Sequence, residues 1–163
     1  MKLISTILLI CSSLVLYSQN SNISFKTVSP LSVYSDIWND IKYSKCNTAA
    51  HADYMSEDEK NTIYILNLIR TNPALFANTV LKKYPSMSGN DHLATDAYYF
   101  LSLVNTLKQM EPLGLLYPDK TCFESAQCHA ASSGMAGYAG HKRINRDCEK
   151  KKLYNGECCD YGH

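Results

Sequence analysis

The sequence lacks the short patterns that identify two common enzyme classes. Neither Gly-x-Ser-x-Gly nor a glycine-rich loop ending in Lys-Ser or Lys-Thr occurs in its 163 residues. The first pattern holds the nucleophile of many serine hydrolases on a sharp turn, and the second binds nucleotide phosphates. The sequence therefore gives no support to a serine hydrolase or to a nucleotide-binding protein.

An excess of charge of one sign is also missing, since the formal net charge is +1. A nucleic-acid-binding protein normally carries clustered basic residues. The densest basic cluster lies in residues 142–152, where Asp147 and Glu149 interrupt it. We interpret this cluster as a solvated loop and expect no nucleic-acid partner.

No hydrophobic run is long enough to cross a membrane comfortably. Lys2 precedes a short apolar stretch over residues 3–16, which is typical of a signal peptide. We predict cleavage after Ser18, which discards Cys11 and leaves Gln19 first; an uncleaved anchor is the alternative that the length disfavours. The mature chain is then neutral, secreted or periplasmic, and has no stable membrane span.

The mature chain keeps an even number of cysteines, and an exported chain with an even number of them favours disulfide bonds. Six cysteines allow fifteen pairings, and the sequence does not choose among them. Two cysteines six residues apart on one helix stand about 9 Å apart along its axis, which disfavours Cys122–Cys128. Adjacent cysteines require a strained ring, which disfavours Cys158–Cys159. The disulfide candidates are Cys46, Cys122, Cys128, Cys148, Cys158 and Cys159.

One domain is expected at this length. Residues 19–55 are polar, and we predict a mostly irregular N-terminal arm packed down by Trp38. Ser56 and Glu59 have capping-box spacing and predict a helix over residues 57–71, with an apolar face that includes Ile63, Leu66 and Ile69. Asn72-Pro73 ends this helix and starts another, which runs to about Lys83 and buries Leu75, Phe76, Val80 and Leu81.

A third helix is predicted from an N-cap near Asp96 to a point before Pro112. Its inward residues are expected to be Tyr99, Phe100, Leu103, Val104 and Leu107. Asp119 is the expected cap of a fourth helix, which ends before His141 and whose inward stripe is Phe123, Ala126, Ala130, Gly134 and Gly137. A polar loop to Lys152 and a short strand around residues 157–161 complete the prediction.

Among the five histidines, His141 is the strongest candidate for a binding role. The glycine-rich segment Gly137-Tyr138-Ala139-Gly140 directly before His141 allows the backbone to approach its neighbours closely. This leaves the His141 ring room to face a cleft. His51 and His92 lie in polar loops. His129 falls outside the predicted inward stripe, so we interpret it as a satisfied or exposed histidine.

The order of three short motifs resembles the CAP superfamily of cysteine-rich secretory, antigen 5 and pathogenesis-related 1 proteins, in its bacterial form. The motifs are residues 66–73, the alanine-rich helix that ends in Gly140-His141, and Gly156-Glu157. The resemblance covers residues 56–163. It implies an α+β fold, in which a small antiparallel sheet lies between helices in an α-β-α sandwich, and the part present is mainly helical.

The resemblance also implies a cleft with two histidines and two acidic residues, which binds a divalent cation in some members. His141 corresponds to the first histidine and Glu157 to the acidic residue of the Gly-Glu-Asn motif, where Cys158 replaces asparagine. The other two residues belong to a downstream Gly-His motif. Gly162-His163 comes too soon after Glu157 to be that motif, so we expect an incomplete domain whose open sheet makes it prone to aggregation.

Three functions remain open at this point. The first is a secreted binding or interaction module for an extracellular lipid, glycan or protein. The second is a metal-dependent hydrolase, in which His141 helps to hold a divalent cation such as zinc and Glu157 acts on water. The third is a structural zinc site formed by Cys148, Cys158, Cys159 and His163, which adjacent ligands and export both disfavour.

Overall fold

The computed structural model describes residues 28–87, 89 and 97–150. This part of the chain is mostly helical and contains no strand, so the helical part of the predicted fold is confirmed and the sheet stays a prediction. The predicted signal peptide, Glu157 and the predicted strand at residues 157–161 lie outside the described residues. Within the described ranges, no helix is both long and apolar enough to cross a membrane.

Helix α1 (Glu57–Thr71) has the predicted boundaries and the predicted cap. The Ser56 hydroxyl accepts a bond from the Glu59 amide at 3.3 Å, and the Glu59 carboxylate accepts one from the Ser56 amide at 2.7 Å. These two bonds satisfy donors that the first helical turn leaves without partners. The capping box therefore fixes where α1 begins.

The buried face of α1 differs from the predicted one. Tyr64, Asn67 and Leu68 are buried, whereas Leu66 is 40% exposed. Apolar residues occur on nearly every side of residues 63–69, so their spacing does not single out one face. The face is instead selected by the N-terminal arm and by residues 113–116, which both contact α1.

The N-terminal arm is better ordered than we predicted. It contains two 3-10 helices, η1 (Asp36–Asn39) and η2 (Ile41–Cys46), which Ser35 and Asp40 cap. Trp38 is completely buried, as expected, and its indole nitrogen donates to the Thr79 hydroxyl at 3.0 Å. The main core consists of Leu31, Trp38, Tyr43, Cys46, Tyr64, Leu68 and Val80.

Polar residues in the 66–73 motif bind both the N-terminal arm and residues 113–116, and so join these two segments to α1. The Asn67 amide binds the Cys46 and Leu116 carbonyl oxygens, and Arg70 Nε donates to the Gly114 carbonyl oxygen at 2.7 Å. Asn72 caps the next helix and donates to the Tyr43 hydroxyl at 3.0 Å. The motif therefore has a structural role.

The second predicted helix is present as a continuous helical path of mixed type. Helix α2 (Pro73–Phe76) runs into the π-helical turn η3 (Ala77–Leu81), and the 3-10 turn η4 (Tyr84–Ser86) follows. Val80 and Leu81 are buried, as predicted, while Leu75 and Phe76 are half-buried.

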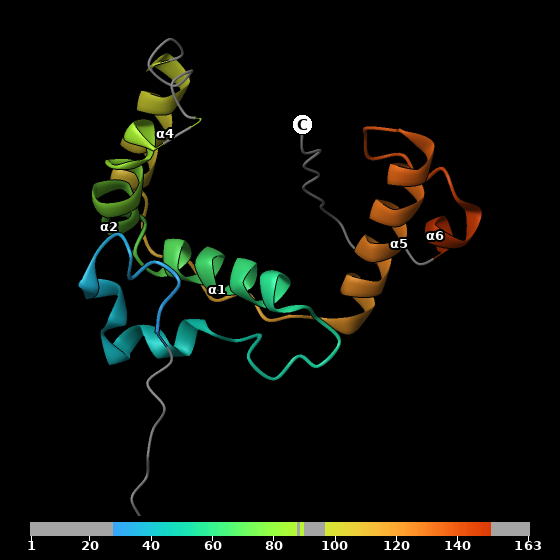
Figure 1. Ribbon diagram of the computed structural model, residues 1–163, viewed down its shortest axis with the longest axis horizontal. Coiled ribbons are helices and arrows are strands. Elements are labelled where there is room, and N and C mark those ends of the chain that lie inside the picture. The colour runs from blue at the N-terminus through green and yellow to red at the C-terminus, as the bar shows by residue number, and fades with distance from the viewer. Residues whose placement is uncertain (1–27, 88, 90–96, 151–163) are drawn as a thin grey trace, which may run out of the picture.

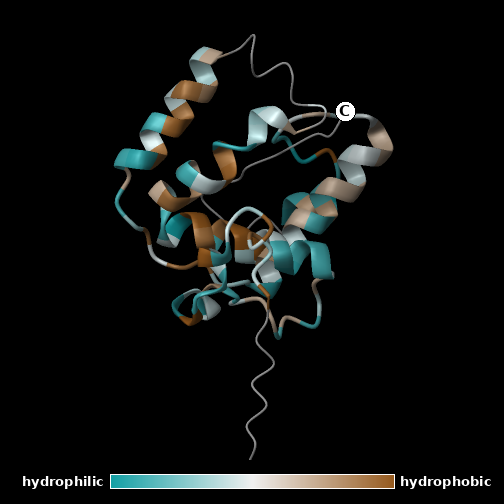
Figure 2. Ribbon diagram, turned by 60° about the vertical axis from the view of Figure 1, so that its left-hand side comes forward, coloured by the Kyte–Doolittle hydropathy of each residue, from teal (hydrophilic) through white to brown (hydrophobic). Residues whose placement is uncertain are grey.

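Helix α4 (Ala97–Gln109) packs on α2 and η3, and a second core cluster centres on Ala77, Leu81 and Leu107. The prediction of an inward Tyr99 and Leu103 is wrong, since these residues are 72% and 48% exposed. A helix that packs on one side only leaves the rest of its apolar surface uncovered. Figure 2 shows apolar residues concentrated around the helices of the core.

Helix α5 (Lys120–Ala136) and helix α6 (Arg146–Lys150) form a separate arm. Figure 1 shows this pair at one end of α1, with α2 and α4 at the other end. Asp119 caps α5, as predicted, and Gly137 ends the helix with a φ of 59°, which an amino acid with a side chain rarely adopts. The short helix α6 replaces part of the predicted polar loop.

Candidate functional site

The buried face of α5 is polar, contrary to the predicted stripe of small residues. Ser125, His129, Ser132 and Ser133 are buried, whereas Ala126, Ala130 and Gly134 are exposed. Alanine and glycine gain little free energy from burial, because they have little apolar surface to remove from water. Contacts with the following loop and with α6 therefore decide which face of α5 turns inward.

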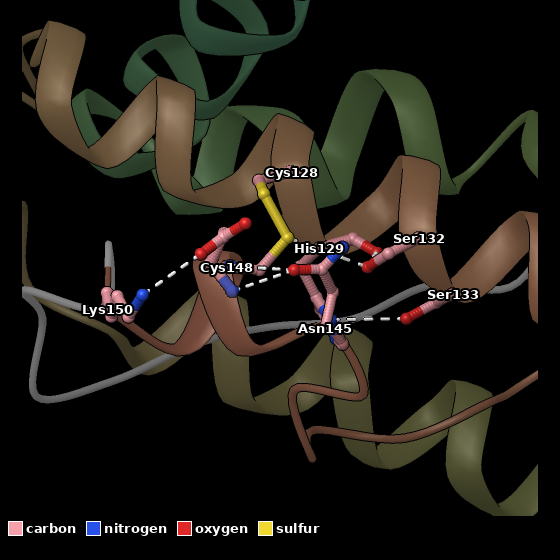
Figure 3. Close-up of a disulfide and its surroundings, with 8 residues drawn as sticks. Cys128, His129, Ser132, Ser133, Asn145, Cys148 and Lys150 are labelled. Atoms are coloured by element: carbon pink, nitrogen blue, oxygen red, sulfur yellow. Dashed lines mark hydrogen bonds and ion pairs between the residues drawn. A yellow bond between two sulfur atoms is a disulfide. The ribbon is translucent and has the colours of Figure 1, made fainter.

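A disulfide between Cys128 and Cys148 joins α5 to α6, with Cα atoms 5.5 Å apart (Figure 3). It closes a segment with a sequence separation of 20 residues. By restricting the unfolded chain, a bond across a loop of that size contributes about 3 kcal/mol of stabilisation. The Asn145 side chain caps α6 by accepting a bond from the Asp147 amide at 2.7 Å.

Next to the disulfide, the buried His129 ring uses both of its nitrogens. Nε2 lies 2.9 Å from the Gly140 carbonyl oxygen, and Nδ1 lies 3.1 Å from the Ser133 hydroxyl. Because a carbonyl oxygen only accepts, Nε2 carries the hydrogen, and in the neutral ring Nδ1 accepts from Ser133. Both nitrogens are engaged inside the protein, so of the two alternatives that the sequence left open for His129, a satisfied or an exposed histidine, the structure shows the satisfied one.

The turn after α5 needs glycine at position 140. Gly140 has a φ of 145°, and a Cβ atom added there would lie 2.6 Å from the Tyr138 hydroxyl oxygen. The positive φ disfavours any residue with a side chain, and an added Cβ would also force the Tyr138 ring to move. The turn doubles back along α5, which brings the Gly140 carbonyl to His129 and leaves the next residue, His141, exposed.

The structure places the predicted site residues as follows. His141 is exposed on this turn, and Glu157 lies outside the described residues. Arg143, which we expected on a solvated loop, is only 6% exposed. Sequence reasoning missed its burial because a run of basic residues gives no sign of which member turns inward.

The cysteines divide into three groups. Cys128 and Cys148 are paired, Cys46 is a buried thiol and Cys122 is an exposed thiol. Cys158 and Cys159 lie outside the described residues. Cys122 and Cys128 share α5 and are not paired with each other, as helix geometry predicted.

Within residues 28–87, 89 and 97–150, no three His, Cys, Asp or Glu side chains form a group able to hold a metal ion.

Replacing His129 with alanine is expected to loosen the turn that carries His141. The change removes one buried and one partly buried hydrogen bond, each of which contributes about 1 kcal/mol, so opening of residues 137–145 should become at least about tenfold easier. Limited proteolysis with trypsin measures this as faster cleavage after Lys142 and Arg143. The matched control is His51→Ala, since His51 is exposed elsewhere; equal cleavage rates in the two variants would contradict the role given to His129.

Comparison with known proteins adds no relative, since no family model, no curated protein and no solved structure matches the chain.

Proposed function

We propose that the chain is an exported protein of the bacterial CAP type, which acts as a binding or interaction module for an extracellular lipid, glycan or protein. The motif order in residues 66–73, 140–141 and 156–157 supports the family, and the sandwich fold with its sheet belongs to this proposal. The observation that carries the binding role is the turn at His141. An exposed ring on a backbone that is fixed from inside is ready to contact a ligand.

Preorganisation explains why this arrangement favours binding. A ligand that contacts a mobile loop must offset the entropy lost when the loop becomes ordered. Here the disulfide, the Asn145 cap and the His129 bonds hold both ends of the turn before any ligand arrives. The free energy of contact with His141 is then available for affinity.

The structural zinc site is not favoured. It requires Cys148 as a thiolate ligand, and Cys148 is bonded to Cys128. Without Cys148, the proposed zinc site keeps three ligands, which are Cys158, Cys159 and His163. Two of these are adjacent in the sequence, which disfavours the site.

Nuclear magnetic resonance of the histidine rings in the full chain tests the proposal. The probes are phosphatidylglycerol vesicles, a soluble peptidoglycan fragment and zinc ions. We expect one of the first two to shift the His141 ring signals and to leave those of His129 unchanged, because His129 is buried and bonded within the protein. His141→Ala should abolish binding, and His51→Ala should not.

The outcomes separate the functions that the sequence left open. A shift of the His141 signals by zinc alone, lost in His141→Ala, would replace the binding module by the metal-dependent hydrolase. Export is measured separately by N-terminal sequencing of the protein recovered outside the cytoplasm, which should begin at Gln19. A chain retained in the cytoplasm would contradict the proposal as a whole.

A further inference from the structure

The outer face of α4 carries no charged side chain over residues 97–107. Lys108 is the first charged residue of the helix, which begins at Ala97. Helix surfaces that face water usually carry charged and polar residues. Here Tyr98 is 76% exposed, Tyr99 is 72% exposed and Leu101 is 55% exposed. A surface without charge that carries large apolar side chains is typical of an interface rather than of a solvated face.

An open groove of about 400 Å³ lies on this face, and six residues of α4 contribute to its lining. They are Tyr98, Leu101, Ser102, Asn105, Thr106 and Gln109. From Tyr98 the positions 102, 105 and 109 follow at steps of four, three and four residues, which is the spacing of a seam between two packed helices. The groove therefore has the register that accepts a second helix.

The six lining residues are arranged symmetrically about the middle of the helix. Each lies as far before the point between Leu103 and Val104 as another lies after it. In an antiparallel pair of α4 helices that cross at this point, the facing residues are Tyr98 with Gln109, Leu101 with Thr106, and Ser102 with Asn105. A hydroxyl group meets an amide in the first and last of these pairs, and a leucine meets a threonine methyl group in the other. The face is therefore complementary to itself, as a two-fold interface requires.

We propose that α4 pairs with α4 of a second copy of the chain in an antiparallel, two-fold symmetric dimer. The small Ser102 side chain near the centre allows the two helix axes to approach to the usual distance of about 8–10 Å. Two neutral faces meet without the like-charge repulsion that a charged helix face would bring. The Tyr99 ring, whose centre lies 5.3 Å from that of the Tyr98 ring, widens the patch at each end of the pair.

The area of the face determines the expected strength of the dimer. A tyrosine side chain has about 150–250 Å² of surface, so Tyr98 and Tyr99 together present about 300 Å² to water. With Leu101 and the polar residues of the groove, each copy contributes about 450 Å², so the pair buries about 900 Å², whereas stable complexes bury about 1,200–2,000 Å². We therefore expect a dimer in equilibrium with the monomer, with a Kd of about 10–100 µM.

The pairing leaves the turn at His141 uncovered in each copy. Figure 1 shows α4 at the end of α1 opposite to α5, which this turn follows. A dimer therefore presents two His141 turns, and a ligand with repeated binding units would engage both with higher avidity. This consequence rests on the proposed function, whereas the pairing itself does not.

Sedimentation equilibrium of the exported full chain, from about 1 µM to about 300 µM, tests the dimer. The average mass should rise from that of one chain towards that of two. Leu101→Glu combined with Thr106→Glu places like charges opposite each other, so it should weaken association at least about tenfold. Leu101→Glu combined with Thr106→Lys places opposite charges face to face in the antiparallel order and should restore association. In a parallel pair the same combination would place each new charge against its own counterpart.

The matched control is Met135→Glu, since Met135 is 86% exposed on α5 and this change should leave the association unchanged. Circular dichroism should show that every variant keeps its helices, because positions 101 and 106 are exposed. A monomer at every concentration would overturn the inference, and so would a monomer that binds phosphatidylglycerol vesicles through this face. Equal association of the like-charge variant and the unchanged chain would also overturn it, because the dimer would then use another surface. Failure of the opposite-charge variant to associate would overturn the antiparallel order. None of these results involves His141, so the proposed function would stand.

Discussion

A Trp38→Ala chain is expected to lose about 3–5 kcal/mol of its free energy of unfolding, the usual cost of removing a large buried aromatic side chain. Trp38 is completely buried, and its ring lies 5.1 Å from the Tyr43 ring. It joins the N-terminal arm to the α2–η3 region through Thr79. Small domains have a total stability of about 5–15 kcal/mol, so the variant should be largely unfolded at moderate urea concentrations.

Urea denaturation followed by circular dichroism measures this loss. The matched control is Tyr99→Ala, which also removes an aromatic ring but from a side chain that is 72% exposed, so its stability should change by less than about 0.5 kcal/mol. Trp38→Phe should cost about 1 kcal/mol in hydrogen bonding, since Thr79 keeps its bond to the Leu75 carbonyl. Equal midpoints for Trp38→Ala and Tyr99→Ala would show that the arm is not part of the core.

An Asn67→Leu chain should lose about 4 kcal/mol, although leucine and asparagine have the same branched outline. The Asn67 amide nitrogen donates towards the Cys46 carbonyl, the Thr48 hydroxyl and the Leu116 carbonyl, and its oxygen accepts from the Leu116 amide at 2.7 Å. Leucine leaves these groups without their Asn67 partner. Each buried polar group left without a partner costs about 1–3 kcal/mol.

The same denaturation experiment tests this value, with Asn105→Leu as the control because Asn105 is exposed on α4. Loss of the Asn67 bonds should also release residues 113–116 before the whole chain unfolds. Amide hydrogen exchange at Leu116 therefore should become faster in Asn67→Leu than global stability alone explains. Unchanged exchange at Leu116 would mean that Arg70 and the Thr48 hydroxyl, which donates to the Leu116 carbonyl, hold this segment without Asn67.

Helix ends could be predicted from the sequence because local side chains determine them. Ser56, Asn72 and Asp119 each accept a bond from the backbone amide three residues later, which depends on the chain only over that distance. For these residues, pattern and structure agree. Gly137 ends α5 through its own backbone conformation, although its spacing had placed it in the inward stripe of the helix.

Helix faces could not be predicted in the same way, because distant segments select them. The apolar spacing of α5 favoured Ala126 and Ala130, yet the Cys128–Cys148 bond turns Ser132 and His129 inward. Leu103 on α4 is exposed for the same reason, because the spacing of apolar residues does not show how many neighbouring segments cover the helix. At the candidate site, the motif made His141 a candidate, which stays a prediction, and the two bonds of His129 depend on a turn whose path is not visible in the sequence.

The interior between α5 and the following turn is polar, and this limits changes in the length of the turn more than changes in its side chains. Apolar surfaces tolerate small sliding movements, whereas hydrogen bonds weaken steeply when donor and acceptor move out of line. Inserting or deleting one residue between Gly137 and Asn145 would shift the Gly140 carbonyl away from His129 and Cys148 away from Cys128. This turn should therefore keep a constant length in any variant that folds, even where its exposed side chains change freely.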